Sequence, residues 1–363
     1  MKRDLFVFAG QSNMMGASVL PPEKTLNIKN SYEYKHKPRR LGRSDNLFVK
    51  AGYPVGEFSY IDLEKAYSSD MTNEKGQSRL SDYIINTFFC PSMSNLKSKK
   101  EKSVHKFSDY SEATAQNGST LAPLLAEEWE SLGGCCAYAH IAKGGVSIDY
   151  FFSDEMVEEY RERISGYNDV NGTGYDPNIL DKNRMPGAAE YFFEKCRDFF
   201  VDSETRFEKE DMTNKCFFWL QGESDGGLSP IEYEFKMQIL WDNLKQIGFS
   251  RFFCIRVDYF GSEDIYRVMT AQENFVKNNK DAYMLTRIAS YFTYPGQNVD
   301  GWFAVKPNEE CENCRDSFYG YNNQHINEKG FFVIAKYAVK NLYRVLSLGK
   351  EPIPEAENIK ILI

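Results

Sequence analysis

Short apolar runs alternate along the chain with longer stretches in which apolar residues recur at helical spacing. Continuous apolar runs bounded by turn residues are typical of strands buried on both faces, and the helical spacing is typical of amphipathic helices. The runs predict strands at Leu5 to Ala9, Cys135 to Ile141, Cys216 to Leu220, Phe252 to Val257 and Ala282 to Thr286. The spaced stretches predict helices at Leu121 to Leu132, Ala188 to Phe207, Pro230 to the stop at Gly248, Glu263 to Asn278 and Glu328 to Leu346. The alternation predicts an α/β chain whose mostly parallel sheet, of about five strands, has helices on both faces.

A single domain spanning residues 1–363 accounts for these elements, with insertions at about 17–118, 149–186 and 291–324. The chain has 363 residues, 42% of them hydrophobic, which is enough to bury a substantial core. A structureless loop as long as the first insertion is uncommon, so we expect short helices and strands there. The composition of the second predicts a loop or lid, and the tail with Pro352 and Pro354 predicts a surface strap.

Charge and hydropathy narrow the classes of partner. The net charge is −8, and nucleic-acid binding needs a basic footprint, so we expect no nucleic-acid partner. The basic runs 35–43 and 97–106 are expected to be solvated loops. No apolar run is long enough to cross a bilayer, so no membrane association is expected. The start of the chain shows no leader pattern, which predicts a cytoplasmic protein, or a secreted one if a leader was removed.

The eight cysteines do not form a metal-binding pattern. Cys216 and Cys254 lie inside apolar runs, where a free thiol behaves as a small hydrophobe. Cys311 and Cys314 form one Cys-x-x-Cys, and a zinc site would need two further ligands at matching spacing. We therefore expect no metal and no cofactor.

Three of the predicted strands end in glycine-containing turns that carry polar side chains. The first strand ends in Gly10-Gln11-Ser12-Asn13, the second in Lys143-Gly144-Gly145, and the third in Gln221-Gly222-Glu223. In a parallel sheet the carboxyl ends of the strands share one edge, and ligands bind in the crevice beyond it. Ser12 is therefore a candidate nucleophile, with a helix N-cap as its alternative role.

These turns belong to three motifs that resemble the first three sequence blocks of the SGNH hydrolases. The variant is that of carbohydrate esterase family six and the sialate O-acetylesterase-like proteins. The motifs are Gly10-Gln11-Ser12-Asn13-Met14 with Gly16, Ala142 to Ile148, and Trp219 to Asp225. The last block of the family, Asp-x-x-His, is matched in part by Asn322 to His325. The resemblance runs from residue 5 to about 347, with long unmatched insertions. It implies a flavodoxin-like three-layer α/β/α sandwich.

The resemblance also implies an activity and a substrate class. The family removes O-acetyl groups from a carbohydrate or polysaccharide through an acyl-enzyme formed on serine, without a metal or cofactor. An acetylated sugar is therefore the expected partner. The 23 Tyr and 4 Trp residues suit such a partner, because flat rings pack on the apolar face of a pyranose, although most are expected in the core.

The chemistry needs a nucleophile, a base and donors for the oxyanion. Ser12 is the expected nucleophile and His325 the expected base. His36 and His105 lie in basic stretches, and His140 lies in a predicted strand, where a structural histidine is the default. The expected oxyanion donors are the backbone N–H groups of Ser12 and Gly145. The resemblance adds the side-chain amide of Gln221, whose alternative role is a structural one, in which it satisfies backbone groups. Residues expected to bind substrate are Gln11, Asn13, Gly144 and Asp225.

The orienting acid is where the sequence departs from the family pattern. Asn322 stands three residues before His325, where the family has Asp. An amide can accept the imidazole Nδ1–H but does not stabilise the imidazolium by charge. Three outcomes are open: Asn322 orients His325, another acid substitutes for it, or the enzyme is degenerate. The candidate acids are Glu223, Asp225 and Asp316, of which Glu223 is favoured because it lies in a matched block; its alternative role is structural.

Two further functions stay open at this point. An O-acetyltransferase would use the same acyl-enzyme and differ in whether a sugar hydroxyl or water attacks it. A non-catalytic glycan-binding protein is motivated by Asn322 and by the aromatic insertions. An unrelated α/β hydrolase is disfavoured because the chain has no Gly-x-Ser-x-Gly motif. The sequence does not specify the sugar, the acetylated hydroxyl or the oligomeric state.

Overall fold

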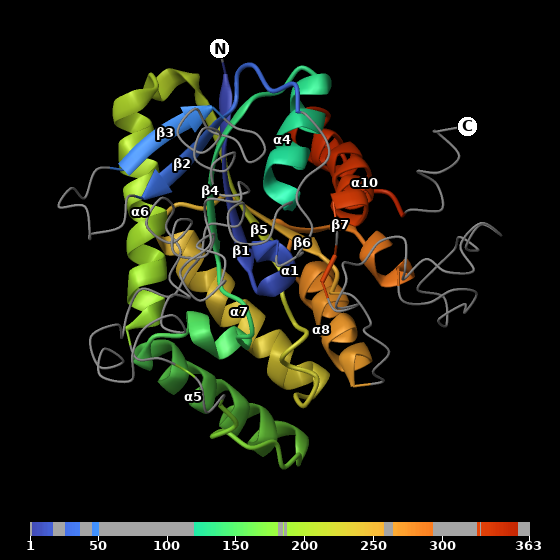
Figure 1. Cartoon of the computed structure of the whole chain (residues 1–363). Helices are drawn as coiled ribbons and strands as arrows, with labels where there is room; N and C mark the ends of the chain where they lie inside the picture. Colours follow the sequence, from blue (N-terminus) through green and yellow to red (C-terminus); the bar gives the residue numbers. More distant parts are fainter. Residues whose placement is uncertain are drawn as a thin grey trace, which may run out of the picture.

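The described part of the chain forms a three-layer α/β/α sandwich around a seven-stranded sheet of order β3-β2-β4-β1-β5-β6-β7 (Figure 1). The computed structural model describes residues 2–16, 26–36, 46–50, 120–180, 184, 187–257, 264–292, 325–326 and 328–354. The strands are β1 (Arg3–Gly10), β2 (Tyr32–His36), β3 (Asn46–Lys50), β4 (Cys136–Ala142), β5 (Met212–Leu220), β6 (Arg251–Ile255) and β7 (Ala282–Thr286). All pairings are parallel except that of β3 with β2 at one edge.

The predicted mostly parallel sheet is confirmed, but it has more strands than expected. The five apolar runs form β1, β4, β5, β6 and β7. The two additional strands, β2 and β3, fall inside the insertion expected at about 17–118 and extend the sheet beyond β4. His36, expected in a loop, is the last residue of β2. The remainder of that insertion, with His105, lies outside the described residues.

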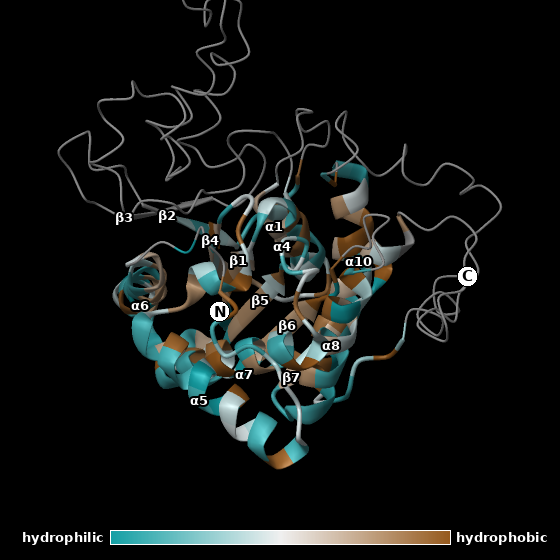
Figure 2. Ribbon diagram, turned by 90° about the horizontal axis from the view of Figure 1, so that it is seen from below, coloured by the Kyte–Doolittle hydropathy of each residue, from teal (hydrophilic) through white to brown (hydrophobic). Residues whose placement is uncertain are grey.

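Seven described helices surround the sheet, and the alternation of side chains along β1 divides them between its two faces. Leu5, Val7 and Ala9 point into a core built with α5 to α8, whereas Phe6 and Phe8 point into a second core built with α1, α4 and α10. Figure 2 shows the mainly brown, hydrophobic strands between helices whose outer turns are teal. The helices are α1 (Ser12–Met15), α4 (Leu121–Ser131), α5 (Asp154–Asn171), α6 (Ala188–Arg206), α7 (Pro230–Gln246), α8 (Ile265–Asn278) and α10 (Glu328–Leu346).

The expectation of a loop or lid at 149–186 is wrong. Its first half forms the 3-10 helix η4 (Ile148–Phe151) and the 18-residue helix α5. Ser153 caps α5 by accepting a hydrogen bond from the Met156 N–H at 3.3 Å, and two acidic residues fill the first turn. Gly172 ends the helix with φ +64. The buried side chains, at helical spacing, are Met156, Val157, Tyr160 and Ile164. These local signals outweigh the loop-like composition.

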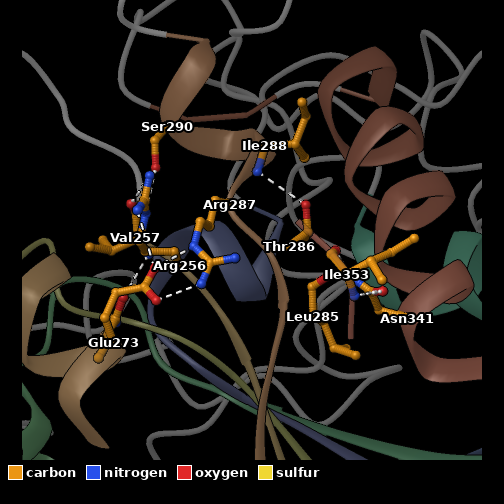
Figure 3. A network of polar contacts seen from close by, with 11 residues as sticks. Arg256, Val257, Glu273, Leu285, Thr286, Arg287, Ile288, Ser290, Asn341 and Ile353 are labelled. Carbon is orange, nitrogen blue, oxygen red and sulfur yellow. Dashed lines mark hydrogen bonds and ion pairs between the residues drawn. The ribbon is translucent and has the colours of Figure 1, made fainter. Parts of the chain in front are cut away.

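The carboxyl ends of β6 and β7 are joined by an ionic network (Figure 3). Glu273 of α8 receives the Arg287 guanidinium through both oxygens, at 2.5 and 2.6 Å, and the fully buried Arg256 at 3.2 Å. Arg256 also donates to the Ser290 hydroxyl at 3.2 Å. Such a network fixes the strand ends because breaking one member would leave a buried charge uncompensated.

The described part of the tail, residues 347–354, lies at the surface as predicted for a strap, and the buried side chain of Asn341 holds it (Figure 3). Residues 355–363 lie outside the described residues. The Asn341 amide donates to the carbonyl oxygens of Leu285 and Ile353 at 2.8 and 3.0 Å, and its Oδ1 accepts from the Ile353 N–H at 2.9 Å. One side chain therefore joins α10, β7 and the strap. No helix in the described ranges is long and apolar enough to cross a membrane.

Candidate active site

The nucleophile candidate Ser12 lies at the carboxyl end of β1, where the chain turns into α1. Gly10 makes this turn possible, because its φ is +149 and a Cβ there would lie 1.9 Å from the Leu220 carbonyl oxygen of β5. The Gln11 N–H donates to that same oxygen at 3.2 Å. Ser12 is the first residue of α1 and is half-buried. Because the first N–H groups of a helix lack intrahelical acceptors, the Ser12 N–H is suited to an anion.

The glycine turn after β4 packs against Ser12, as the sequence predicts for neighbouring parallel strands. The Lys143 N–H donates to the Gly10 carbonyl at 3.0 Å, which docks the turn on the serine segment. A Cβ built on Gly144 would lie 3.8 Å from the Ser12 Cβ and 3.3 Å from the Met15 Cε. Gly145 is exposed, with φ +70. The backbone of this turn is therefore accessible close to the Ser12 side chain.

Asn13 connects the serine turn to two distant segments. Its Nδ2 donates to Glu223 Oε1 at 2.8 Å, and its Oδ1 accepts from the Ile326 N–H at 3.0 Å. Ile326 directly follows His325, so this contact brings the histidine segment to the serine turn across 313 sequence positions. His325 is half-buried, and burial lowers the pKa of its imidazole below the usual 6.5. A lowered pKa keeps the ring neutral, which is the form that acts as a base.

Glu223 projects from the turn after β5 and is largely withdrawn from solvent. Burial raises the pKa of its carboxyl to about 7, opposed by hydrogen bonds from Asn13 and from the backbone at Gly222 and Glu223. Its Oε2 is buried and has no hydrogen-bond partner within the described part of the chain. The side-chain contact that the structure gives this carboxylate is the Asn13 amide. Glu223 is thus linked to the His325 segment through Asn13.

A buried amide hub lies beneath the site and joins all three strand-end turns. Gln221 Nε2 donates to the Gln11 Oε1 at 3.2 Å, to the Val146 carbonyl at 3.1 Å and to Asp225 Oδ2. Gln11 Oε1 also accepts from the Ser224 N–H at 3.3 Å. The hub therefore sets the serine turn, the glycine turn and the β5 turn relative to one another.

Asp225 extends this hub to the segment that follows the glycine turn. Its carboxylate accepts the Ile148 N–H at 3.1 and 3.3 Å. Burial raises the pKa of Asp225 to about 8, and nearby Asp149 adds to the rise, while hydrogen bonds from Gln221 and Ile148 and the charge of Lys236 oppose it. Lys236 itself is fully buried and paired with Asp149 at 2.8 Å.

Several residues expected to touch substrate are instead part of this scaffold. Gln221 is fully buried, and its two amide hydrogens serve three protein acceptors, so this arrangement leaves none for an oxyanion. Gln11 and Asp225 are 4% and 3% exposed, and Asn13 is inaccessible. These side chains hold the site from behind, which is the structural alternative for Gln221. Gly144 and Gly145 stay at the accessible surface of the site.

Two supporting residues were not found from the sequence as part of the site. The Tyr233 hydroxyl of α7 donates to Gln221 Oε1 at 2.7 Å, and Gln272 Nε2 of α8 donates to the Gln221 carbonyl at 2.8 Å. Both lie on helices at apolar-face spacing, and nothing local marks them as hub partners. His140, expected to be structural, is 2% exposed and hydrogen-bonds the Met14 carbonyl at 2.7 Å, behind α1.

The remaining predicted site residues fall outside the described residues. Asn322 and Asp316 lie in the range 293–324, as do Cys311 and Cys314. The cysteines that the structure describes are free and buried, in agreement with thiols that act as small hydrophobes. No group of three or more His, Cys, Asp or Glu residues within the described ranges could hold a metal ion.

Comparison with known proteins found similarity among solved structures. No family model and no curated protein matches the sequence. A protein from Arabidopsis thaliana has 13% identity and a TM-score of 0.45, over 94% of this chain and 97% of that one. NanS has 10% identity and a TM-score of 0.43, over 94% of this chain and 98% of that one. A carbohydrate acetylesterase from Xanthomonas citri has 12% identity and a TM-score of 0.36, over 77% of this chain and 49% of that one. The chain thus spans about half the length of the Xanthomonas protein.

Proposed function

We propose that this protein is a serine esterase that removes O-acetyl groups from a carbohydrate or polysaccharide. The observation that carries the proposal is the hydrogen bond from the Ile326 N–H to Asn13 Oδ1, at 3.0 Å. It joins the residue after the candidate base to the residue after the candidate nucleophile. The substrate class comes from the resemblance of the three strand-end motifs to carbohydrate O-acetylesterases.

In the proposed reaction, His325 takes the proton of the Ser12 hydroxyl as its oxygen attacks the acetyl carbonyl. The negative charge that develops on the carbonyl oxygen is stabilised by the backbone N–H groups of Ser12 and Gly145. His325 then protonates the departing sugar oxygen, which leaves an acetyl group on Ser12. Water, deprotonated by His325, attacks this acyl-enzyme and releases acetate. Asn322 is the proposed group that orients the imidazole, by accepting its Nδ1–H.

Acetate release tests this proposal directly. Wild type, Ser12→Ala, His325→Ala and Asn322→Asp are assayed on an aryl acetate and on a panel of acetylated saccharides. We expect the Ser12 and His325 variants to lose at least about 1,000-fold in kcat/KM, because nucleophile and base act as one unit. Ser131→Ala, which removes an exposed hydroxyl from α4, is the matched control and should retain full activity.

The same assay separates the alternatives. Wild type that releases no acetate from the whole panel contradicts the esterase proposal. Acetyl groups that appear on an added sugar acceptor instead of in acetate would identify a transferase. Saccharide binding that survives Ser12→Ala, in a protein without turnover, would identify a glycan-binding protein. If Asn322→Asp raises the rate, the missing carboxylate limits catalysis.

A further inference from the structure

Asn13 occupies a position where only a side chain with both a donor and an acceptor can satisfy its neighbours. Asn13 is completely buried, and the Nδ2 and Oδ1 ends of its amide face groups with opposite hydrogen-bonding needs. The carboxylate of Glu223, on one side, needs a donor, and the backbone N–H of Ile326, on the other, needs an acceptor. An amide meets both, whereas an apolar side chain would remove the side-chain donor of Glu223 and leave the Ile326 N–H without this acceptor.

The helix that carries Asn13 is fixed from behind. The Met14 carbonyl oxygen accepts hydrogen bonds from His140 Nε2 at 2.7 Å and from the Thr120 hydroxyl at 3.2 Å. His140 comes from β4 and Thr120 directly precedes α4. Because α1 is held on this side, its Asn13 side chain provides a fixed reference point. The segment at Ile326 is therefore positioned against a rigid part of the molecule.

Glu223 determines which way the Asn13 amide faces. Its Oε1 accepts from Asn13 Nδ2, so the amide oxygen is turned toward the Ile326 N–H. This orienting function needs an acceptor at Glu223 and does not need a negative charge. It differs from the function of a triad acid, which stabilises the imidazolium by charge.

We propose that Asn13 is a positioning residue for the esterase reaction, with Glu223 as the anchor that orients its amide. Asn13 holds the backbone next to His325 at a fixed place relative to Ser12, so that base and nucleophile meet in reactive geometry. This inference rests on the proposed function for its catalytic consequence. The clamp itself, formed by Glu223, Asn13 and the Ile326 N–H, is a contact that can be measured without activity.

Two readouts test the clamp: kcat and KM for acetate release, and hydrogen–deuterium exchange of the peptide that contains the Ile326 amide. Asn13→Ala should lower kcat about 10- to 100-fold with KM changed less than about threefold, because a small misplacement of a reacting group is costly while substrate contacts persist. The Ile326 amide should exchange at least about tenfold faster, as expected when a buried hydrogen bond is lost. Asn243→Ala, which removes a half-buried amide bonded to the Ile239 carbonyl within α7, is the control.

Variants at Glu223 separate an anchor from a triad acid. Glu223→Gln retains an acceptor, so kcat should stay within about threefold of wild type, whereas Glu223→Ala should behave like Asn13→Ala. Asn13→Asp alone sets two carboxylates against each other and should lose activity. In the double variant Asn13→Asp with Glu223→Gln, the new carboxylate at position 13 accepts from the new amide at position 223 and from the Ile326 N–H. Both contacts are restored with the first reversed in direction, so the variant should recover most of kcat and of the Ile326 protection.

The outcomes distinguish failure of the clamp from failure of the proposed function. Equal loss in Glu223→Gln and Glu223→Ala would overturn the anchor role and assign Glu223 a role through its charge. Unchanged exchange at Ile326 in Asn13→Ala would overturn the clamp. If Asn13→Ala does not fold, the Glu223 pair and the double variant decide the question. Wild type without acetate release overturns the proposed function and with it the catalytic role of Asn13, whatever the exchange data show.

Discussion

At the scale of single residues, the site contains two kinds of polar residue. Some are accessible enough to contact a substrate, and others are buried and hold the first kind in place. Ser12 and His325 are half-buried, and Gly145 is exposed. Asn13, Gln221 and Asp225 belong to the same sequence motifs but are buried and bonded to protein. Polar residue type and position in a motif therefore did not separate the two groups, because both need polar side chains at strand ends.

The pKa of His325 leads to a prediction about pH dependence. Burial favours the neutral imidazole and lowers its pKa below 6.5. A base must be neutral to act, so kcat/KM should rise with pH through a midpoint below 6.5 and then level off. The measurement is the pH profile of kcat/KM on an aryl acetate.

Asn322→Asp serves as the comparison in that profile. A carboxylate close to the imidazolium would favour the charged ring, so the midpoint should move to higher pH in this variant. A wild-type midpoint above 6.5 would contradict the effect assigned to burial.

At the scale of elements, strong local signals in the sequence were sufficient to predict a helix. Where the surrounding composition was typical of a loop, the helix was not predicted. The helix predicted from Pro230 is confirmed as α7, and it starts at a capping box of Ser229 and Glu232 with both reciprocal hydrogen bonds, at 3.2 and 2.7 Å. By contrast, α5 was missed because its glycine- and asparagine-rich surroundings suggested a loop. The Ser153 cap and the helical spacing of the apolar residues are both present in the sequence and indicate the helix that the structure shows.

Two glycines, Gly166 inside α5 and Gly172 directly after it, test this assignment. Gly166 is exposed in the helix interior, and a Cβ there would meet nothing within 4 Å. Gly166→Ala should therefore raise the free energy of unfolding by about 0.5–1 kcal/mol, since alanine loses less backbone entropy on folding. Thermal or urea unfolding measures the change.

Gly172→Ala is the matched control for the helix. Gly172 ends α5 with φ +64, a conformation that a residue with a Cβ adopts at a cost of about 1–2 kcal/mol. The two substitutions should therefore have opposite signs. Equal effects would contradict a helix that continues through Gly166 and ends at Gly172.

At the scale of the whole molecule, the sheet brings together residues that are far apart in sequence. Ser12 follows β1, the glycine turn follows β4, and Glu223 follows β5, and these three strands are neighbours in the sheet order. The hub of Gln11, Gln221 and Asp225 then joins the turns. Global stability and site geometry are therefore coupled through buried polar groups.

The raised pKa of Asp225 predicts how the free energy of unfolding changes with pH. Its pKa is about 8 in the folded chain against a usual 3.8, so the native state favours the protonated acid. The stabilisation is complete below 3.8 and is lost as pH rises through about 8, with about 1.4 kcal/mol for each pKa unit. Between about pH 6 and 8 the free energy of unfolding should therefore fall in wild type, and this contribution should level off above the folded pKa of about 8.

Asp225→Asn should make this fall shallower, because an amide does not ionise. Urea unfolding at several pH values measures the slope, and Asp169→Asn, at an exposed position on α5, is the control. Equal slopes in wild type and Asp225→Asn would contradict a protonated Asp225. Glu223, with a pKa of about 7, contributes in the same direction in both proteins, so it does not affect the comparison.

The sequence by itself determined five strands of the sheet, most of the described helices and the turns at which chemistry is placed. These features follow from hydrophobic periodicity and from glycine and cap residues, which act within a few positions along the chain. For that reason β1, β4, β5, β6 and β7 could be predicted, together with the Ser12, Gly144 and Glu223 turns. Short strands were expected in the first insertion, but the positions of β2 and β3 and their pairing with the sheet could not be predicted, because the periodicity there is weak.

Only the tertiary structure decided which polar side chains of those turns face solvent and which are buried. From the sequence alone, Gln221 could be an oxyanion donor or a buried residue that supports the site through hydrogen bonds. Its partners Tyr233 and Gln272 come from helices α7 and α8, and the Ile326 partner of Asn13 is 313 positions away. Burial and hydrogen-bond pairing are properties of packed surfaces, so they are set only when these distant segments meet.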